Sequence, residues 1–204
     1  MSDHLRYAGA DRVTQLQALD GIIRAQPMLM SVLHELRAMA LPDHLLVAGA
    51  IYNSVWNALT GRDALTGIND IDVVYFDPTD LGWDAEDAVI KLLDQRFSAL
   101  PVPVQARNQA RVHLWFEDKF GSPFAPLASS AEMLGRYAST THAVGVRLTQ
   151  AGTLDIVAPF GLDDLFSFRI VPNPVLANKL AHDSKAARAK GIWPELTIID
   201  WPGA

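Results

Sequence analysis

The chain has 204 residues, is 50% hydrophobic and 20% charged, and carries a formal net charge of -6 with no cysteine. This size and apolar content suit one domain with a sizeable core, the missing cysteines exclude disulfides and thiolate zinc sites, and the acidic balance argues against bulk binding to nucleic-acid phosphates. No apolar run is long enough to cross a bilayer and the N-terminal sequence lacks the shape of a signal peptide, so we expect a cytoplasmic protein without a membrane partner.

Two amphipathic helices are expected at the start of the chain. The first spans residues 11–25, where Asp11 is placed to cap the N-terminus, and the second begins at Pro27 and ends near Met39. The apolar stripe of the first helix consists of Val13, Leu16, Leu19 and Ile23. Helical spacing of this kind predicts one buried face on each helix.

A strand, a helix and a second strand are predicted next. The segment "HLLVAGA" is typical of a short strand that stops at Gly49, and "AIYNSVWNALTG" has helical spacing up to Gly61. After a turn-rich loop, "DIDVVYFD" is typical of a strand, which Pro78 closes.

The rest of the chain alternates further strands and helices. The clearest helix spans residues 83–100, with Asp84 as its expected cap and a buried stripe formed by Ala85, Val89, Leu92 and Leu93. Strands are predicted in "VPVQAR", "AVGVRLT" and "LDIVAPF", and helices near 129–138 and 175–189. The alternation indicates an α/β or α+β class with a small mixed sheet. We expect a single domain over residues 1–204, with a core at about 11–190 and a flexible start at 1–10.

Two acidic residues, Asp70 and Asp72, stand two apart in front of the apolar run "VVYF". Side chains two apart in a strand point to the same face, so the two carboxylates repel each other unless a cation lies between them. Magnesium is usually held by one or two carboxylates together with substrate phosphates. The pair therefore predicts a metal site with Asp70 and Asp72 as ligands. The alternatives are that both acids lie on a solvated edge, or that one of them caps a turn after Asn69.

Two further segments are candidates for ligand binding. Gly49 and Ala50 lie at the start of a predicted helix, where free N–H groups and the positive end of the dipole favour a phosphate, although an ordinary tight turn has the same sequence. The segment "RNQARVHLW" is dense in polar groups. Four of them could bind a nucleotide or form a buried network that fixes one loop, namely Asn108, Gln109, Arg111 and His113.

The segment "APFGLDDLF" predicts a short helix with a buried side. Asp163 and Asp164 fall in its first turn, where capping is the expected role. The residues assigned to the core are Phe160, Leu162, Leu165 and Phe166.

The order of strand, Gly-Ala turn, helix and Asp-Ile-Asp strand resembles the nucleotidyltransferase (DNA polymerase β-like) superfamily. The sequence is also similar to a bacterial group of unknown function within it, usually called nucleotidyltransferase family proteins. The matching segments fall in the same order across residues 44–178, and they are "VAGAIYNSVWNALTGR", "DIDVVYFD", "DLGWDAEDAVI", "PVPVQARNQARVHLW", "TTHAVGVRL" and "APFGLDDLFSFRIVPNPVL".

This resemblance implies an α+β nucleotidyltransferase-like fold, with a small mixed sheet, packed helices and extra helices at both ends. It implies metal-dependent transfer of a nucleoside monophosphate from an NTP to an unknown acceptor, with Mg²⁺ or Mn²⁺ as the cofactor. Asp70 and Asp72 would then be catalytic and would hold the metal. The residues that it implies for nucleotide binding are Gly49, Ala50, Asn53, Asn108, Arg111 and His113.

Two positions depart from the superfamily pattern. Ala50 stands where a Ser usually follows the Gly, so one hydroxyl contact to phosphate is missing. Gln105 stands at the catalytic position where related sequences carry a third acid, and an amide cannot accept a proton and supplies no charge. Asp155 is a candidate to compensate, and the alternative for it is an ordinary place at a strand end.

Two other functions stay open beside the transferase. The loss of an acid at Gln105 fits a weakened or inactive nucleotide-binding protein on the same fold. Exposed apolar surface near Trp193 and Trp201 would fit a protein-interaction module. The sequence leaves the acceptor and the oligomeric state undefined.

Overall fold

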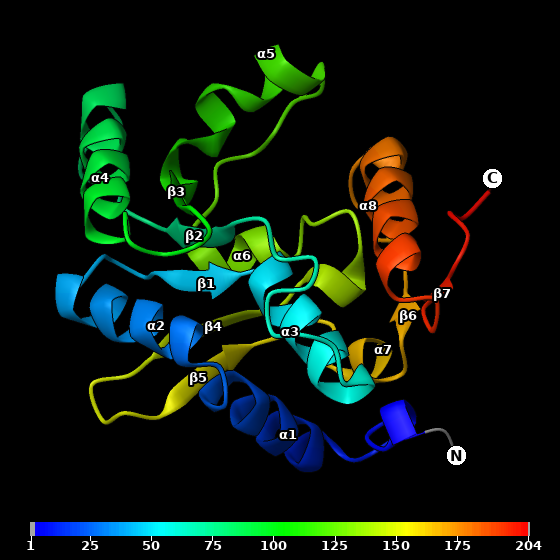
Figure 1. The fold of residues 1–204 in the computed structure, drawn as a ribbon. Coiled ribbons are helices and arrows are strands. Elements are labelled where there is room, and N and C mark those ends of the chain that lie inside the picture. The colour runs from blue at the N-terminus through cyan, green and yellow to red at the C-terminus, as the bar shows by residue number, and fades with distance from the viewer. Residues whose placement is uncertain (1–2, 204) are drawn as a thin grey trace.

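A five-stranded mixed sheet forms the centre of the fold in the computed structural model, which describes residues 3–203 (Figure 1). The strand order is β3-β2-β1-β4-β5, with β2 and β3 parallel and the other neighbours antiparallel. The strands are β1 (Leu45–Val47), β2 (Ile71–Tyr75), β3 (Val104–Asn108), β4 (Gly145–Leu148) and β5 (Leu154–Val157). The predicted small mixed sheet is therefore confirmed.

Helices pack around this sheet and extend the fold at both ends. The α-helices are α1 (Arg12–Arg24), α2 (Pro27–Met39), α3 (Gly49–Thr60), α4 (Trp83–Arg96), α5 (Phe116–Phe120), α6 (Ser130–Leu134), α7 (Asp163–Phe166) and α8 (Lys179–Ile192). The 3₁₀-helices are η1 (Asp3–Leu5), η2 (Gln109–Leu114) and η3 (Thr140–His142), and a second, two-stranded sheet joins β6 (Arg169–Ile170) to β7 (Thr197–Ile198). No helix within residues 3–203 combines the length and the apolar character needed to cross a membrane.

The first two helices begin and end where the sequence predicts. The side chain of Asp11 accepts a hydrogen bond from the Thr14 N–H at 2.9 Å, which caps α1, and α2 begins at Pro27. The assignment of Val13 to the buried stripe is wrong, because its side chain is 63% exposed. Gln15 occupies the buried face instead, where it donates hydrogen bonds to the Tyr7 carbonyl and to Asp163.

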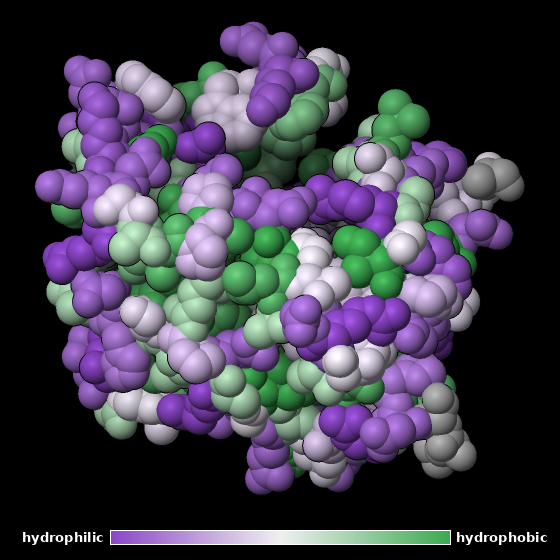
Figure 2. Space-filling model, in the orientation of Figure 1, coloured by the Kyte–Doolittle hydropathy of each residue, from purple (hydrophilic) through white to green (hydrophobic). Residues whose placement is uncertain are grey.

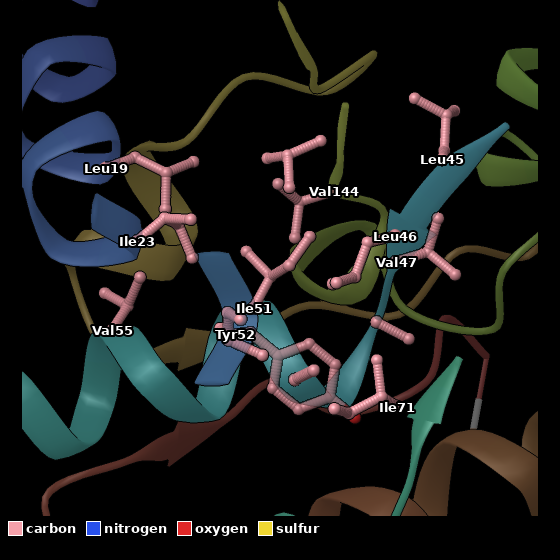
Figure 3. Packing of buried hydrophobic residues seen from close by; sticks show 14 of the residues in the cluster. Leu19, Ile23, Leu45, Leu46, Val47, Ile51, Tyr52, Val55, Ile71 and Val144 are labelled. Atoms are coloured by element: carbon pink, nitrogen blue, oxygen red, sulfur yellow. The ribbon is translucent and has the colours of Figure 1, made fainter. Parts of the chain in front are cut away.

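The main core lies between α3 and the sheet. Figure 3 shows Ile51 of α3 between Leu19 and Ile23 of α1 on one side and the side chains of β1 on the other. All of these side chains have no exposed surface. Full burial of one such aliphatic side chain contributes about 1.5–3 kcal/mol, so α3 is held firmly under the strands that it connects.

Helix α4 departs from its predicted pattern in two respects. Asp84 does not cap it, because Gly82 is the N-cap residue and no side chain bonds to the first turn. Leu92 is 45% exposed, whereas Glu86 is buried. The buried face is therefore shifted toward Glu86, which the sequence pattern places in water because a lone glutamate is rarely buried without a partner.

The segment around α7 also differs from prediction. Asp163 does not cap the helix, since it accepts a hydrogen bond from the Gly9 N–H at 2.7 Å and so ties the N-terminal segment to α7. Asp164 faces Arg169 at 3.6 Å, and no side-chain cap is found at this helix. Phe160 is 47% exposed and does not join the core, while the other predicted apolar residues of the segment are buried.

The C-terminal helix has a structural task that the sequence did not reveal. Trp193, which follows α8, is 1% exposed and cannot be part of the exposed apolar surface expected near it, whereas Trp201 is half-buried. Its indole N–H donates to the Asn57 side chain at 3.1 Å. Gly67 lies directly against the Trp193 ring with a φ of +71°, so a side chain at this position would be strained and would clash with the ring. The end of α8 thereby fixes the loop between α3 and β2.

Candidate active site

The two predicted acids lie at the start of β2. Asp72 is in the strand, and Asp70 precedes the strand by one residue. In the register of the sheet, Asp72 pairs with Val47 of β1 and with Gln105 of β3. Because paired residues on neighbouring strands project to the same face, the Asp72 and Gln105 side chains occupy adjacent positions on that face. The fold therefore brings the acid pair and Gln105 together.

Asp72 sits in an electrostatically unfavourable place. Burial raises the pKa of its carboxyl above the ordinary 3.8, and the neighbouring Asp70 raises it further, while Lys185 and Arg107 act in the opposite direction. Like charges that share a site favour the protonated form of one of them. A cation bound between Asp70 and Asp72 would remove this cost.

The turn between β1 and α3 lies beside Asp72. Ala48 has a φ of 59° and a ψ of -128°, a conformation that costs a non-glycine residue about 1–3 kcal/mol. Helix α3 begins at Gly49, and within residues 3–203 the N–H groups of Gly49 and Ala50 have no hydrogen-bond partner. Free N–H groups at the positive end of a helix dipole are suited to an anion. The strained turn thus places a helix start that is suited to an anion next to the acids.

Asn53 and Asn57 of α3 hold the loop that leads to Asp70. Asn53 is 5% exposed and donates to the Gly67 carbonyl at 3.0 Å. Asn57 donates to the carbonyls of Ala64 and Thr66. The contacts found for Asn53 are therefore loop contacts, and its nucleotide-binding role stays a prediction.

One cation from α8, Lys185, which sequence reasoning missed, joins the site, and a second one, Arg188, lies near enough to influence Tyr52. Lys185 lines a cleft together with Asp72, and its charge lowers the pKa values of both Asp72 and His142. Arg188 lowers the pKa of Tyr52. Within the described chain, neither of them nor Arg107 forms an ion pair with a carboxylate. The sequence signal was weak, since two cations three apart on a helix usually mark only a solvated face.

Tyr52 and His142 form a buried neutral pair near these charges. Their rings stack with centroids 4.3 Å apart. Burial raises the pKa of Tyr52 to about 12, and burial together with the nearby Lys185 lowers the pKa of His142 to about 3. At neutral pH the phenol keeps its proton and the imidazole is uncharged. The pair can therefore position a ligand but cannot act as a strong base.

The polar segment that begins at Arg107 is used largely inside the protein. Arg111 donates hydrogen bonds to Glu86 and, at 2.8 Å, to the Leu81 carbonyl. Glu86 also accepts from the Asn108 N–H at 2.8 Å, and the Asn108 side chain bonds to the backbone of Asp77. These contacts favour the buried-network interpretation for Asn108 and Arg111. The network fixes the end of β3 and so the strand that carries Gln105.

The other two polar residues of this segment differ in position. Gln109 lines the cleft of Asp72, and its buried amide oxygen has no hydrogen-bond partner within residues 3–203. His113 is half-buried and lies outside the residues that line this cleft. A role in ligand binding is therefore better supported for Gln109 than for His113.

Replacing Arg111 with lysine tests the network. The variant keeps the charge but loses the planar fork that bonds to Glu86 and Leu81, so we expect the free energy of unfolding to fall by about 1–2 kcal/mol. Nucleotide affinity should stay unchanged. Urea denaturation and nucleotide titration measure the two effects. Weakened nucleotide binding at unchanged stability would instead make Arg111 a ligand-binding residue.

Two adjoining spaces open above the acid face of the sheet. The smaller one, here called the acid cleft, has a volume of about 210 Å³ and is lined by Asp72, Arg107 and Gln109 among others. The larger one, here called the aromatic cavity, has a volume of about 520 Å³. They share the lining residues Ala48, Trp115, Met133, Tyr137 and Lys185. The spaces are therefore contiguous.

Asp155 does not compensate for Gln105. It lies on β5, at the far edge of the sheet, where Arg147 pairs with it at 2.7 Å and with Asp43 at 2.8 Å. Three strands separate β5 from the edge strand that carries Gln105. The carboxylates near the acid cleft are thus Asp70 and Asp72.

The donor set fits a metal ion that is shared with a substrate. Within residues 3–203, no group of three or more His, Asp or Glu side chains could enclose a metal by itself. Two carboxylates next to free backbone N–H groups and unpaired cations match the usual arrangement for Mg²⁺, in which substrate phosphates complete the coordination.

Comparisons with known proteins identify the family and the fold. A family model described as nucleotidyltransferase matches residues 34–198. A solved structure described as revealing a CCA-adding enzyme head domain is similar over 91% of this chain and 96% of its own, with 25% identity and a TM-score of 0.73. A tRNA nucleotidyltransferase complexed with a primer tRNA and an incoming ATP analog is 19% identical, with 81% of this chain and 46% of that chain covered and a TM-score of 0.48. No curated protein matches the sequence.

Proposed function

Because the chain belongs to the nucleotidyltransferase family, we propose that it transfers a nucleoside monophosphate from an NTP to an acceptor with the help of Mg²⁺ or Mn²⁺. The observation that carries the proposal is the placement of Asp70 and Asp72 beside the free N–H groups of Gly49 and Ala50. Transfer of this kind depends mainly on positioning and on neutralising the charge of the phosphates. The site offers both.

Each group has a defined task in this reaction. Asp70 and Asp72 would hold the metal, which would supply charge neutralisation for the phosphates. The amides of Gly49 and Ala50, with Lys185, bind the triphosphate. The acceptor hydroxyl attacks the α-phosphorus, the bond to the β-phosphate oxygen breaks, and pyrophosphate leaves. Gln105 cannot take the acceptor's proton, and Asp70 and Asp72 are engaged as metal ligands, so the proton passes to solvent water.

The acceptor belongs to the same proposal. The net charge of -6 argues against a long nucleic acid bound along its backbone, but a single RNA end would need only a few contacts. A CCA-adding enzyme head domain and a tRNA nucleotidyltransferase stand among the similar structures, which makes RNA ends the first acceptors to test. We further propose that the chain is one cytoplasmic domain.

Labelled NTPs test the function directly. The protein is incubated with α-phosphate-labelled NTPs, Mg²⁺ and acceptors that include RNA ends, protein side chains and hydroxyl-bearing antibiotics. We expect a metal-dependent rise in melting temperature with NTP and labelled product with one acceptor class. Absence of both the thermal shift and the product across this panel would reject the proposal.

Replacing Lys185 with alanine tests the phosphate contact from α8. Lys185 is exposed and unpaired within the described chain, so its loss should leave the melting temperature unchanged. The KM for NTP should rise about tenfold, because one charge-assisted hydrogen bond to phosphate is lost. Lys179→Ala on the same helix is the matched control, since Lys179 pairs with Asp183 instead. Equal KM values in the two variants would remove Lys185 from the site.

A second function has support from one observation. Gln105 stands in register with Asp72, at the place where an acid would be most useful, and it supplies neither charge nor a base. This arrangement favours a protein that binds a nucleotide and turns it over slowly or not at all. Tight NTP binding without labelled product is the result that would select this function.

A further inference from the structure

The aromatic cavity is much less polar than the acid cleft that it adjoins. Its walls come from segments that are distant in sequence, namely η2–α5, α6–η3 and the start of α8. Trp115, Phe116, Phe120 and Tyr137 line it with rings, and Leu176 and Leu180 close the opposite side. Figure 2 shows the hollow between the α5 region and α8, with hydrophobic residues on its walls. Its volume of about 520 Å³ lies in the range of small-molecule sites.

Two polar groups in this cavity have no partner. His142 is 3% exposed, and its Nε2 makes no hydrogen bond within residues 3–203. The Asn178 side-chain oxygen is also buried without a partner in that range. Buried polar atoms are normally satisfied, and each one left unpaired carries a desolvation cost. The cavity therefore suits a flat apolar ligand whose edge carries hydrogen-bonding groups.

The acid cleft and the aromatic cavity together suit one kind of ligand. The acid cleft is lined by Asp72, Arg107 and Lys185. It adjoins the turn that carries the free N–H groups of Gly49 and Ala50, so it suits a polyphosphate with a metal. The aromatic cavity offers ring faces and unpaired polar atoms. Lys185 and Ala48 line both spaces, so one molecule can extend from one into the other. A polyanion joined to a flat heteroaromatic ring has the chemistry of a nucleotide.

We propose that the aromatic cavity binds the base of the incoming nucleotide and that the Asn178 side chain hydrogen-bonds the edge of that base. The inference rests on the proposed nucleotidyl transfer, and it assigns the base to this cavity rather than to the space beside Trp83. That other space, about 470 Å³ in volume and lined by Trp83, Arg107 and Trp115, stays free for the acceptor. Stacking on the cavity's rings supplies affinity for any base, and Asn178 supplies the preference among bases.

Nucleosides without phosphates separate base binding from phosphate binding. Adenosine, guanosine, cytidine and uridine are titrated into the full chain by NMR. At least one should bind without a metal and should compete with a non-hydrolysable NTP. Phe120→Ala should weaken that binding about tenfold, because one stacking face is lost. Asn178→Leu should reduce the differences in affinity among the four nucleosides.

Phe160→Ala is the matched control, because Phe120 and Phe160 are similarly exposed, at 57% and 47%, and both variants should fold. It should leave nucleoside binding unchanged. Nucleoside binding that is insensitive to Phe120→Ala, or simultaneous binding of nucleoside and NTP, would overturn the inference.

The labelled-transfer assay keeps the two proposals apart. Transfer activity without nucleoside binding in the cavity would refute the base site and keep the function. Base binding that depends on Phe120, without any transfer product, would keep the base site and refute catalysis.

Discussion

Asp72→Asn is expected to lower the rate of nucleotidyl transfer about a thousandfold while the fold stays intact. The variant removes one of the two carboxylates available for the metal, and loss of the charge that holds a catalytic cation costs several kcal/mol of transition-state stabilisation. Single-turnover transfer of a labelled nucleotide measures the effect. Asp155→Asn is the matched control, because Asp155 lies at the far edge of the sheet in an ion pair with Arg147.

The same variant should be more stable than the wild type at neutral pH. The pKa of Asp72 is raised in the folded state, first by burial and then by Asp70, so the folded state holds this proton more firmly than the unfolded chain. Unfolding free energy therefore falls as the pH rises from about 3.8 through the raised pKa, and the cost is fully present above it. Asparagine removes this cost.

Thermal denaturation at several pH values tests whether Asp72→Asn is more stable than the wild type, as expected. The stability advantage of Asp72→Asn should be present at pH 7 and should vanish below pH 3.8, where Asp72 is protonated in both states. Mg²⁺ should stabilise the wild type at pH 7 and have little effect on the variant. Full transfer activity in Asp72→Asn, or destabilisation at pH 7, would contradict the assigned role.

Gln105→Glu is expected to raise the transfer rate by about 10²–10⁴-fold. The new carboxylate would stand in register with Asp72 on the same face, where it can accept a proton and share the metal. General base catalysis by a well-placed side chain contributes gains of this size. Gln105 is exposed on an edge strand, so the substitution needs no repacking. Steady-state transfer with Mg²⁺ measures the gain.

The control for Gln105→Glu is Gln150→Glu, which adds the same charge in the exposed turn after β4. It should leave the rate unchanged. In Gln105→Glu, the added carboxylate near Asp70 and Asp72 should lower the free energy of unfolding when no metal is bound. Mg²⁺ should then stabilise this variant more than the wild type. An unchanged rate in Gln105→Glu, with NTP still bound, would favour the protein that binds nucleotide without turnover.

The central part of the site could be predicted because it depends on local pattern. Asp70 and Asp72 precede an apolar strand, and a glycine ends the preceding strand, so strand period and helix-start chemistry place them together. The neighbouring position of Gln105 followed from the resemblance, and the β2–β3 register then brought it next to Asp72. Local sequence pattern is therefore sufficient to place functional side chains that lie on one strand.

The rest of the site depends on contacts that no local pattern contains. Lys185 lies far along the chain from Asp72, and only the packing of α8 brings it to the cleft. Arg111 and Asn108 could be ligands or structural residues by sequence, and the buried Glu86 on α4 favours the structural role. Leu92 was misassigned for the same reason, since a glutamate with two buried partners displaces the expected apolar face.

The contact between Trp193 and Gly67 connects α8 to the loop before Asp70, so one helix contacts both the phosphate side and the metal side of the candidate site. One part of the helix carries Lys185 and Arg188, and its end presses on the loop that leads to Asp70. A small rigid-body tilt of α8 would therefore move the phosphate contacts and the metal ligands together. The release of pyrophosphate and the loosening of the acid pair would then be one event, and the C-terminal end of the chain would help to set how fast product leaves.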